Sequence, residues 1–276
     1  MRTLTLILTL TILTTQLKSQ SYQKQQAELF ATNIIFSGFS SGIGACFNKK
    51  SNQTFINAFA NGFWKGSIGG AVSYIGKRIN YQIVKQNNLV YAWPAKVVNS
   101  LGCSMAENGA FNRGLLEQVH LYLGFTRLDY NFKYNAFQVR FNPTTIISYY
   151  QLVKGDGGKL DINNSLKMGT VLIRHENCAK EYYGLTSSNV IWYTDDDHVK
   201  ITLAHENIHV FQNEQDDIFN SYFSFQKKVN NKVYRGLENY IYIHNSLASN
   251  IMYRITPSHF ENEAYSIAEH NLLNCK

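Results

Sequence analysis

The sequence lacks several patterns that would place it in a familiar class. Its four cysteines form no Cys-x-x-Cys pair, which excludes the usual cysteine zinc site. It has no run of five like charges and no basic stripe, so we expect no nucleic-acid partner. Its glycines match neither the phosphate-binding loop nor the dinucleotide-binding fingerprint. No internal repeat or low-complexity linker divides the chain, so the informative features must be sought in individual segments.

Charge is almost absent from the first twenty residues. Arg2 is followed by an uncharged apolar run, Leu4–Leu17, and then by small and polar residues. This order is typical of a secretory signal peptide, so we expect residues 1–20 to be removed and the protein to be periplasmic, envelope-bound or secreted. The alternative is an uncleaved anchor, although the run is short for a membrane span. Loss of Arg2 and Lys18 lowers the formal net charge from +7 to about +5, which is compatible with an anionic cell surface.

The cysteines are Cys46, Cys103, Cys178 and Cys275. In an oxidising compartment an even number predicts two disulfides, and we expect Cys178 and Cys275 to close the C-terminal region. The alternative is a set of buried free thiols.

Two stretches near the N-terminus have little or no charge. Residues 29–47 carry none, and residues 55–76 carry only Lys65. Glycines recur at intervals of four in both, a spacing that lets two helix backbones approach closely. We therefore expect a glycine-rich helical hairpin, either soluble or associated with a membrane.

The middle of the chain has a different pattern of residue types, which predicts a helix followed by strands. A proline at position 94 predicts a helix through about residue 108. Beyond it, alternating or β-branched and aromatic segments predict four or five antiparallel strands over 117–174 and one more at 189–193. The expected strand segments include 119–125, 137–141, 146–153 and 170–173. A second late helix is expected at 236–254, with Tyr240 and His244 on one face.

The most informative segment reads HENIH at residues 205–209. The region 199–215 contains neither proline nor glycine, and three aspartates at 195–197 precede it, so we expect a helix here. On a helix His205 and His209 share one face and can hold one metal ion, whereas Glu206 lies beside it and could take a proton from water. The alternative is a pair of buried histidines satisfied by hydrogen bonds.

A third ligand is needed for a catalytic zinc site. Downstream, Thr256 and Pro257 predict a helix start, and Glu261 follows in its second turn. Glu263, His259 and His270 are alternative ligands. Glu261 could instead form a capping box with Ser258, which stands three residues before it.

HExxH followed on a later helix by Glu-x-x-Ala-Asp resembles the gluzincin type of zinc metallopeptidase. The resemblance covers about the last third of the chain and includes His205, Glu206, His209, Glu261 and Ala264. It implies that the two histidines and Glu261 bind Zn²⁺ and that Glu206 is the general base. The sequence departs from this pattern at position 265, where a tyrosine replaces the aspartate that supports a ligand.

These expectations combine into one architecture. We predict an α+β fold with a signal peptide at 1–20, a glycine-rich helical region at 21–115, and a sheet with a zincin-like helical part at 116–276. The last two form either one domain or two. The predicted function is that of an exported zinc hydrolase, foremost a metallopeptidase acting on peptides or proteins. The alternative is a non-catalytic binding or structural protein of the envelope or membrane, in which the metal only stabilises a helix.

Overall fold

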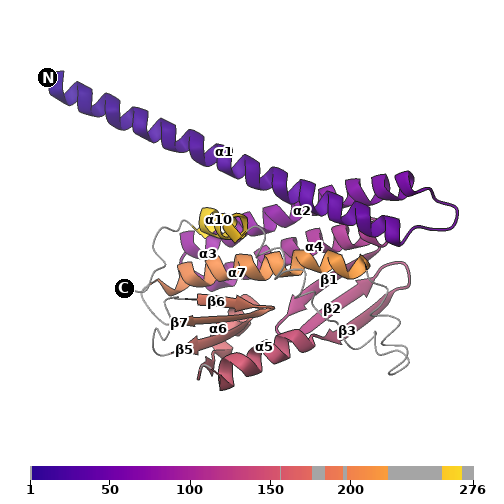
Figure 1. The fold of residues 1–276 in the computed structure, drawn as a ribbon. Coiled ribbons are helices and arrows are strands. Elements are labelled where there is room, and N and C mark those ends of the chain that lie inside the picture. Colours follow the sequence, from indigo (N-terminus) through magenta and orange to yellow (C-terminus); the bar gives the residue numbers. More distant parts are fainter. Residues whose placement is uncertain (1, 156, 176–183, 195–197, 223–256, 269–276) are drawn as a thin grey trace.

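The computed structural model describes residues 2–155, 157–175, 184–194, 198–222 and 257–268, with side chains from Gln23 onward except at 220–222, 257–259 and 268. It confirms the α+β class. Helices α1, α2 and α4 form one layer and the strands form another, with α4 packed on β1 and α7 packed against β6 and β7 (Figure 1). The elements in chain order are α1 Arg2–Phe47, α2 Phe55–Asn80, α3 Gln82–Lys85, η1 Leu89–Tyr91, α4 Ala92–Ala110, β1 Gln118–Leu123, β2 Thr126–Asn131, β3 Ala136–Phe141, α5 Pro143–Lys154, β4 Lys159–Leu160, α6 Ile162–Met168, β5 Val171–His175, β6 Gly184–Ser187, β7 Val190–Thr194, α7 Val199–Asp216, η2 Asp217–Tyr222 and α10 Pro257–Ala268.

The expected helical hairpin is present as α1 and α2. Its glycines do what their spacing predicts: a Cβ atom at Gly66 would collide with the Ser37 carbonyl, and one at Gly62 with the Ser41 carbonyl. Thr54 caps α2 by accepting a hydrogen bond from the Asn57 amide at 3.2 Å. The absence of side chains at these glycines therefore sets how closely the two helices pack.

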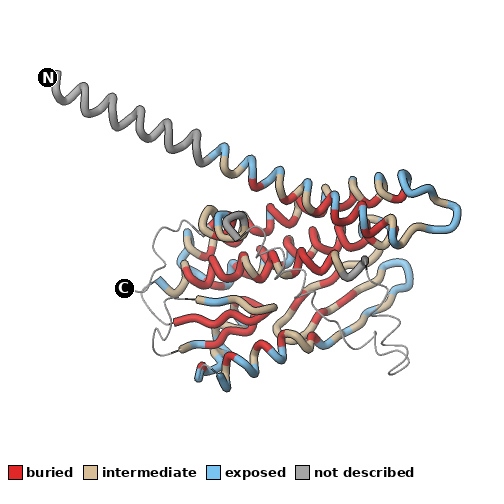
Figure 2. The backbone as a smooth tube through the Cα atoms, in the orientation of Figure 1, coloured by how far each residue is buried: buried red, intermediate tan, exposed pale blue. Residues whose placement is uncertain are grey.

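Helix α7 is the centre of the fold. Its apolar side chains, among them Leu203, Ile208 and Phe211, are fully buried, and most of the helix is enclosed (Figure 2). The same hydrophobic core includes Ile83 before α4 and Ile267 on α10. The helical region 21–115 and the later part 116–276 thus share one core. The aspartates at 195–197 lie outside the described residues, and the helix begins at Val199 with no side-chain cap.

The strands form two sheets. The first is antiparallel with order β1-β2-β3, as expected from the alternating segments, although β2 was not predicted. The second has the order β4-β5-β7-β6, and its central pair β5–β7 is parallel. This pair joins the expected segment 170–173 to the separately expected strand at 189–193, for which no direction was predicted, and the connection from β5 to β7 passes through the edge strand β6.

The predicted strand at 146–153 was also wrong, because this segment lies in helix α5. Its β-branched and aromatic residues suggested a strand, but Pro143 occupies the first turn of the helix, where a missing amide is tolerated. Thr145, Ser148 and Leu152 are buried at helical spacing. The periodicity of burial, which composition alone does not show, decides the structure here.

The described cysteines are unpaired. Cys46 and Cys103 carry free thiols, so the expectation of two disulfides was wrong, and burial raises the pKa of Cys103 above its usual range. Cys178 and Cys275, with the pairing expected between them, lie outside the described residues. So do the expected helix at 236–254, Tyr240 and His244.

Candidate metal centre

The two histidines of α7 and one glutamate of α10 converge. His205 Nε2 stands 3.2 Å from His209 Nε2, and the carboxylate oxygens of Glu261 lie 3.4 Å and 3.5 Å from these two nitrogens. Ligand atoms around a tetrahedral zinc, at about 2.0–2.1 Å from the metal, stand about 3.3–3.5 Å apart. The separations therefore fit one zinc ion held by His205, His209 and Glu261.

The burial of these groups gives the centre one open side. The side chains of His205 and His209 are 4% and 15% exposed, whereas that of Glu261 is 30% exposed. Solvent therefore reaches the centre past Glu261, on the α10 side of the helix pair.

The hydrogen bonds of His209 fix its tautomer. Gln212 donates its amide protons to the Phe260 carbonyl and to Glu263, at 3.1 Å and 2.9 Å, which turns its Oε1 toward His209. An amide oxygen only accepts, so His209 Nδ1, 2.8 Å away, must donate the proton. In the neutral ring the lone pair then lies on Nε2, which faces His205 and Glu261. This is the tautomer that a metal ligand requires.

Glu263 anchors this arrangement and is not turned toward the two histidines. Its carboxylate accepts a hydrogen bond from Lys77 at 2.8 Å and one from Asn33 at 2.6 Å, besides the bond from Gln212. Burial alone would raise the pKa of Glu263, but Lys77 and these donors hold it below the ordinary value. Helices α1 and α2 thus help to orient His209, the candidate ligand on α7, through Glu263 of α10 and Gln212. Of the alternative ligands, Glu263 is committed to Lys77, the side chain of His259 lies outside the described part, and so does His270.

The acidic surroundings also act on His209. Burial lowers its pKa, but the hydrogen bond to Glu261 and the negative charge of Glu206 outweigh burial and raise it above the ordinary value. The centre therefore favours positive charge, which either a proton or a metal cation can supply.

Glu206 lies beside the centre and faces the sheet. Its Oε2 accepts a hydrogen bond from Thr186 on β6 at 2.7 Å, and the side chain is almost wholly buried. A Cβ atom at Gly184 would lie 2.8 Å from the Glu206 carboxylate, so a glycine on β6 leaves room for this group. The structure therefore keeps Glu206 out of the ligand set and places it between the histidines and an edge strand.

Two features depart from the gluzincin pattern. Tyr265, at the position of the expected aspartate, packs against the His205 ring at 4.7 Å between ring centroids. Burial and the charges of Glu261 and Glu206 raise the pKa of Tyr265. His205 Nδ1 is buried and meets no hydrogen-bond acceptor among the described residues. His205 thus lacks the hydrogen-bonded support that His209 receives from Gln212.

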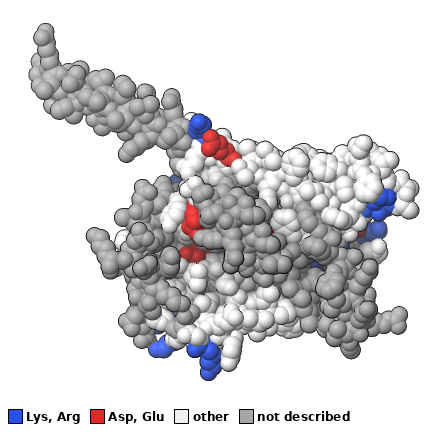
Figure 3. Space-filling model, viewed as in Figure 1, with Lys and Arg blue, Asp and Glu red and all other residues white. Residues whose placement is uncertain are grey.

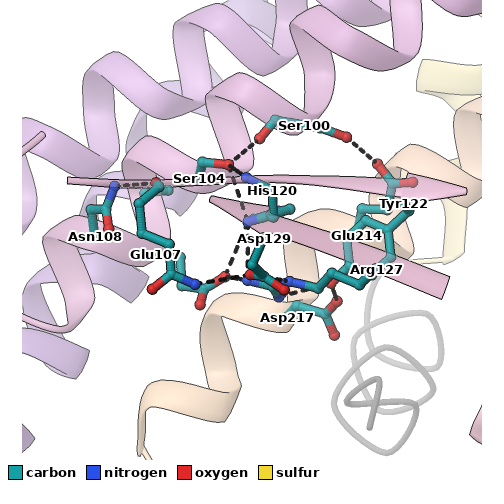
Figure 4. A network of polar contacts seen from close by, with 12 residues as sticks. Ser100, Ser104, Glu107, Asn108, His120, Tyr122, Arg127, Asp129, Glu214 and Asp217 are labelled. Carbon is teal, nitrogen blue, oxygen red and sulfur yellow. Dashed lines mark hydrogen bonds and ion pairs between the residues drawn. The ribbon is translucent and has the colours of Figure 1, made fainter. Parts of the chain in front are cut away.

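A second buried polar cluster lies between α4 and the first sheet (Figure 4). Arg127 is fully buried and donates to Glu107 at 2.7 Å, to Asp129 at 3.0 Å and to the Tyr122 hydroxyl at 3.0 Å. Tyr122 in turn donates to Asp217 at the start of η2. The cluster was missed from the sequence because alternation of apolar and polar residues identifies a strand but does not tell which of its two faces turns toward the protein interior. Here the polar face of β1 and β2 is the inner one.

His120 belongs to this cluster as a neutral ring. Its Nδ1 lies 3.0 Å from the Arg127 guanidinium, which can only donate, so Nδ1 must accept. Burial, together with the charge of Arg127, lowers the pKa of His120 to about 4.

Comparisons with known proteins add nothing to this geometry. No protein-family model matches the chain, and neither the curated proteins nor the solved structures gave a match.

Proposed function

We propose that this chain is an exported zinc-dependent hydrolase, a metallopeptidase of gluzincin type. The observation that carries the proposal is the convergence of two imidazole nitrogens and one carboxylate at separations of 3.2–3.5 Å, with an unligated glutamate beside them. Two histidines and a glutamate are a ligand set of catalytic zinc, which leaves a coordination position for water or substrate. When bound, zinc would polarise a carbonyl group and lower the pKa of water.

The chain's own residues would divide the remaining work. Glu206 would accept the proton from the attacking water and return it to the leaving amine, as general acid–base catalysis requires. Thr186 orients the Glu206 carboxylate from β6, which stands at the end of the strand order in its sheet. An extended peptide lying along that edge would pass close to Glu206, which supports a peptide substrate.

Export rests on residues 1–20 and is compatible with the packing of α1. The first described side-chain contacts of α1 with other elements begin at Gln26, which accepts a hydrogen bond from the Tyr74 hydroxyl at 2.7 Å. Cleavage near residues 19–22 would leave these contacts intact.

The second candidate is a non-catalytic protein in which the metal only joins α7 to α10. It is favoured by the burial of Glu206 against Thr186 and by Tyr265 in place of the aspartate. The two candidates share the metal ligands and differ in whether Glu206 acts on a water molecule.

The deciding experiment compares two variants, each with one glutamate replaced by glutamine. Wild type should retain one zinc per chain after gel filtration without chelator, and His205→Ala should retain none. Glu206→Gln should keep the zinc and lose at least ~10²-fold in the rate of peptide release from a mixed library. Glu261→Gln should weaken zinc retention, because a carboxylate ligand becomes a neutral amide.

Each result has one reading. Wild type that binds no zinc when saturated with it would refute the metal centre. Zinc-loaded wild type with no chelator-sensitive peptide release would refute the peptidase and leave the non-catalytic candidate. Full activity in Glu206→Gln would show that Glu206 is not the general base.

A further inference from the structure

The outer face of the α1–α2 hairpin is apolar. On α1 the exposed positions include Ile35, Phe39, Ile43 and Phe47, which recur every four residues and so form one stripe along the helix. On α2 the large exposed side chains are Phe55, Ile56, Trp64, Ile68 and Ile75. The ring of Phe39 in the α1 stripe packs edge to face against Phe59 and Phe63 of α2.

The inner face of the same hairpin is made of small and polar residues. Where α1 meets α2 and α4, its buried positions include Asn33, Ser37, Ser41 and Ala45. Those of α2 include glycines, Ser73 and two lysines. A water-soluble helix has the opposite arrangement, with the large apolar side chains inside. Small residues between helices and large apolar ones outside are the arrangement found in membranes.

Charged side chains are kept away from the outer face. The Lys65 ammonium donates to the Arg113 carbonyl at 2.6 Å and lies 5.6 Å from the centroid of the Trp64 ring, at the edge of the outer face, whereas Lys77 is turned inward to Glu263. No charged residue occurs between Glu28 and Lys49. Figure 3 shows an uncharged upper surface with charged groups toward both ends.

The length of this uncharged face matches a bilayer. The twenty residues from Leu29 to Asn48 span about 30 Å as a helix, close to the thickness of the hydrocarbon core of a membrane. Lys24 and Arg78 stand at one end of the antiparallel pair, and Lys49 and Lys50 at the other. In the described chain, the segment Gln23–Phe47 is long and apolar enough to cross a membrane, with mean hydropathy 1.3, and half of its best window is buried. The stripe described above belongs to the half that is not buried.

An open apolar groove runs beside this stripe. It lies between α1 and η2 and is lined by Ile35, Phe36, Phe39, Ile43 and Phe219, together with two hydroxyl side chains. It offers a hydrocarbon chain a channel on the same face.

We propose that the outer face of the α1–α2 hairpin is buried in the hydrocarbon layer of a lipid bilayer. A second copy of the chain would also cover an apolar face, but it would not require an uncharged length equal to the bilayer core with cations at both ends. This inference does not depend on the metal centre, since none of the outward residues contacts His205, His209 or Glu261.

Trp64 provides a local probe, with 46% of the residue exposed on the outer face of α2. The full chain is reconstituted into vesicles of neutral phosphatidylcholine, with and without bromine on the acyl chains, and tryptophan fluorescence is compared with that of Trp64→Phe. We expect the difference signal, which belongs to Trp64, to fall at least about twofold with brominated lipid and to resist aqueous acrylamide. Because the signal is local, anchoring of the chain by residues 1–20 does not produce it.

A charged double variant and a matched control sharpen the test. Phe39→Lys with Ile43→Lys should make the Trp64 signal sensitive to acrylamide, because a lysine in the hydrocarbon core is strongly disfavoured. Ile162→Lys with Leu166→Lys alters two similarly spaced exposed apolar positions on α6 and should leave it unchanged. Quenching of Trp64 by acrylamide in the wild type would overturn the proposal. Protection from both quenchers would also overturn it, since Trp64 would then be covered by a second copy of the chain.

Discussion

The molecule contains two buried polar clusters that differ in whether their described ion pairs include arginine. Around Arg127, every acidic group faces a cation or a donor: Glu107 and Asp129 pair with Arg127, and Arg140 contacts Asp129 at 2.6 Å. Around His205, three electron-pair donors converge and no lysine or arginine is among their described ion pairs. A balanced cluster is complete as it stands and acts as a scaffold. The second cluster brings two imidazole nitrogens and one carboxylate to separations that suit a metal ion, so it is a candidate binding site.

Breaking the balanced cluster should have the largest effect on stability. Arg127→Met removes a fully buried cation and leaves Glu107 and Asp129 without it, so we expect a loss of about 3–5 kcal/mol in the free energy of unfolding. Denaturant unfolding of the metal-free protein measures it.

Arg140→Met is the matched control. Arg140 also pairs with Asp129, but its side chain is 15% exposed, and we expect a loss near 1 kcal/mol. Equal losses in the free energy of unfolding for the two variants would contradict the distinction between fully buried Arg127 and partly exposed Arg140.

The neutral state of His120 should appear in the dependence of stability on pH. Its pKa of about 4 in the folded protein lies below the ordinary 6.5, so the unfolded chain takes up a proton first as the pH falls. The stabilisation is complete above pH 6.5 and is lost between about pH 6.5 and 4. His120→Gln removes this titration and should flatten the curve by up to about 3 kcal/mol, at about 1.4 kcal/mol per pKa unit.

Unfolding curves of wild type and His120→Gln at closely spaced pH values test this, and their difference cancels the titration of the other groups. His198→Gln removes an exposed histidine and serves as the control. Parallel curves for wild type and His120→Gln would show that His120 is not held neutral.

The smallest effect is expected at the support of His209. Gln212→Met keeps the length of the side chain but removes the acceptor of the Nδ1 proton, so zinc affinity should fall about 10–100-fold. Competition against a chromophoric chelator measures the affinity.

Gln215→Met is the matched control, because Gln215 bonds Ser37 and Lys77 in the same network without touching His209. It should change the affinity less than threefold, about 0.6 kcal/mol. If both variants lower the affinity for zinc equally, the network acts through general packing and not through the tautomer of His209.

The sequence was most informative where chemistry is local. His205, Glu206 and His209 lie on one helix, whose periodicity fixes their relative positions, and Pro257 indicates the start of the helix that carries Glu261. These four residues could therefore be named from the sequence. The support of His209 could not, because Lys77 and Glu263 are 186 residues apart. The inward face of β1 and β2 was equally hidden, since alternation looks the same from either side. Helix α5 was misassigned because its residue types favour a strand while its burial follows a helix.

The bond between Lys77 and Glu263 has a consequence for the order in which the protein is made. Synthesis runs from the N-terminus, so Lys77, Asn33 and both histidines emerge from the ribosome before α10 exists. Until Glu261 and Glu263 follow, Lys77 lacks its counter-ion and the third ligand is missing. The three candidate ligands therefore come together only after α10 has been made, and a chain that stops before α10 carries the histidine pair without Glu261.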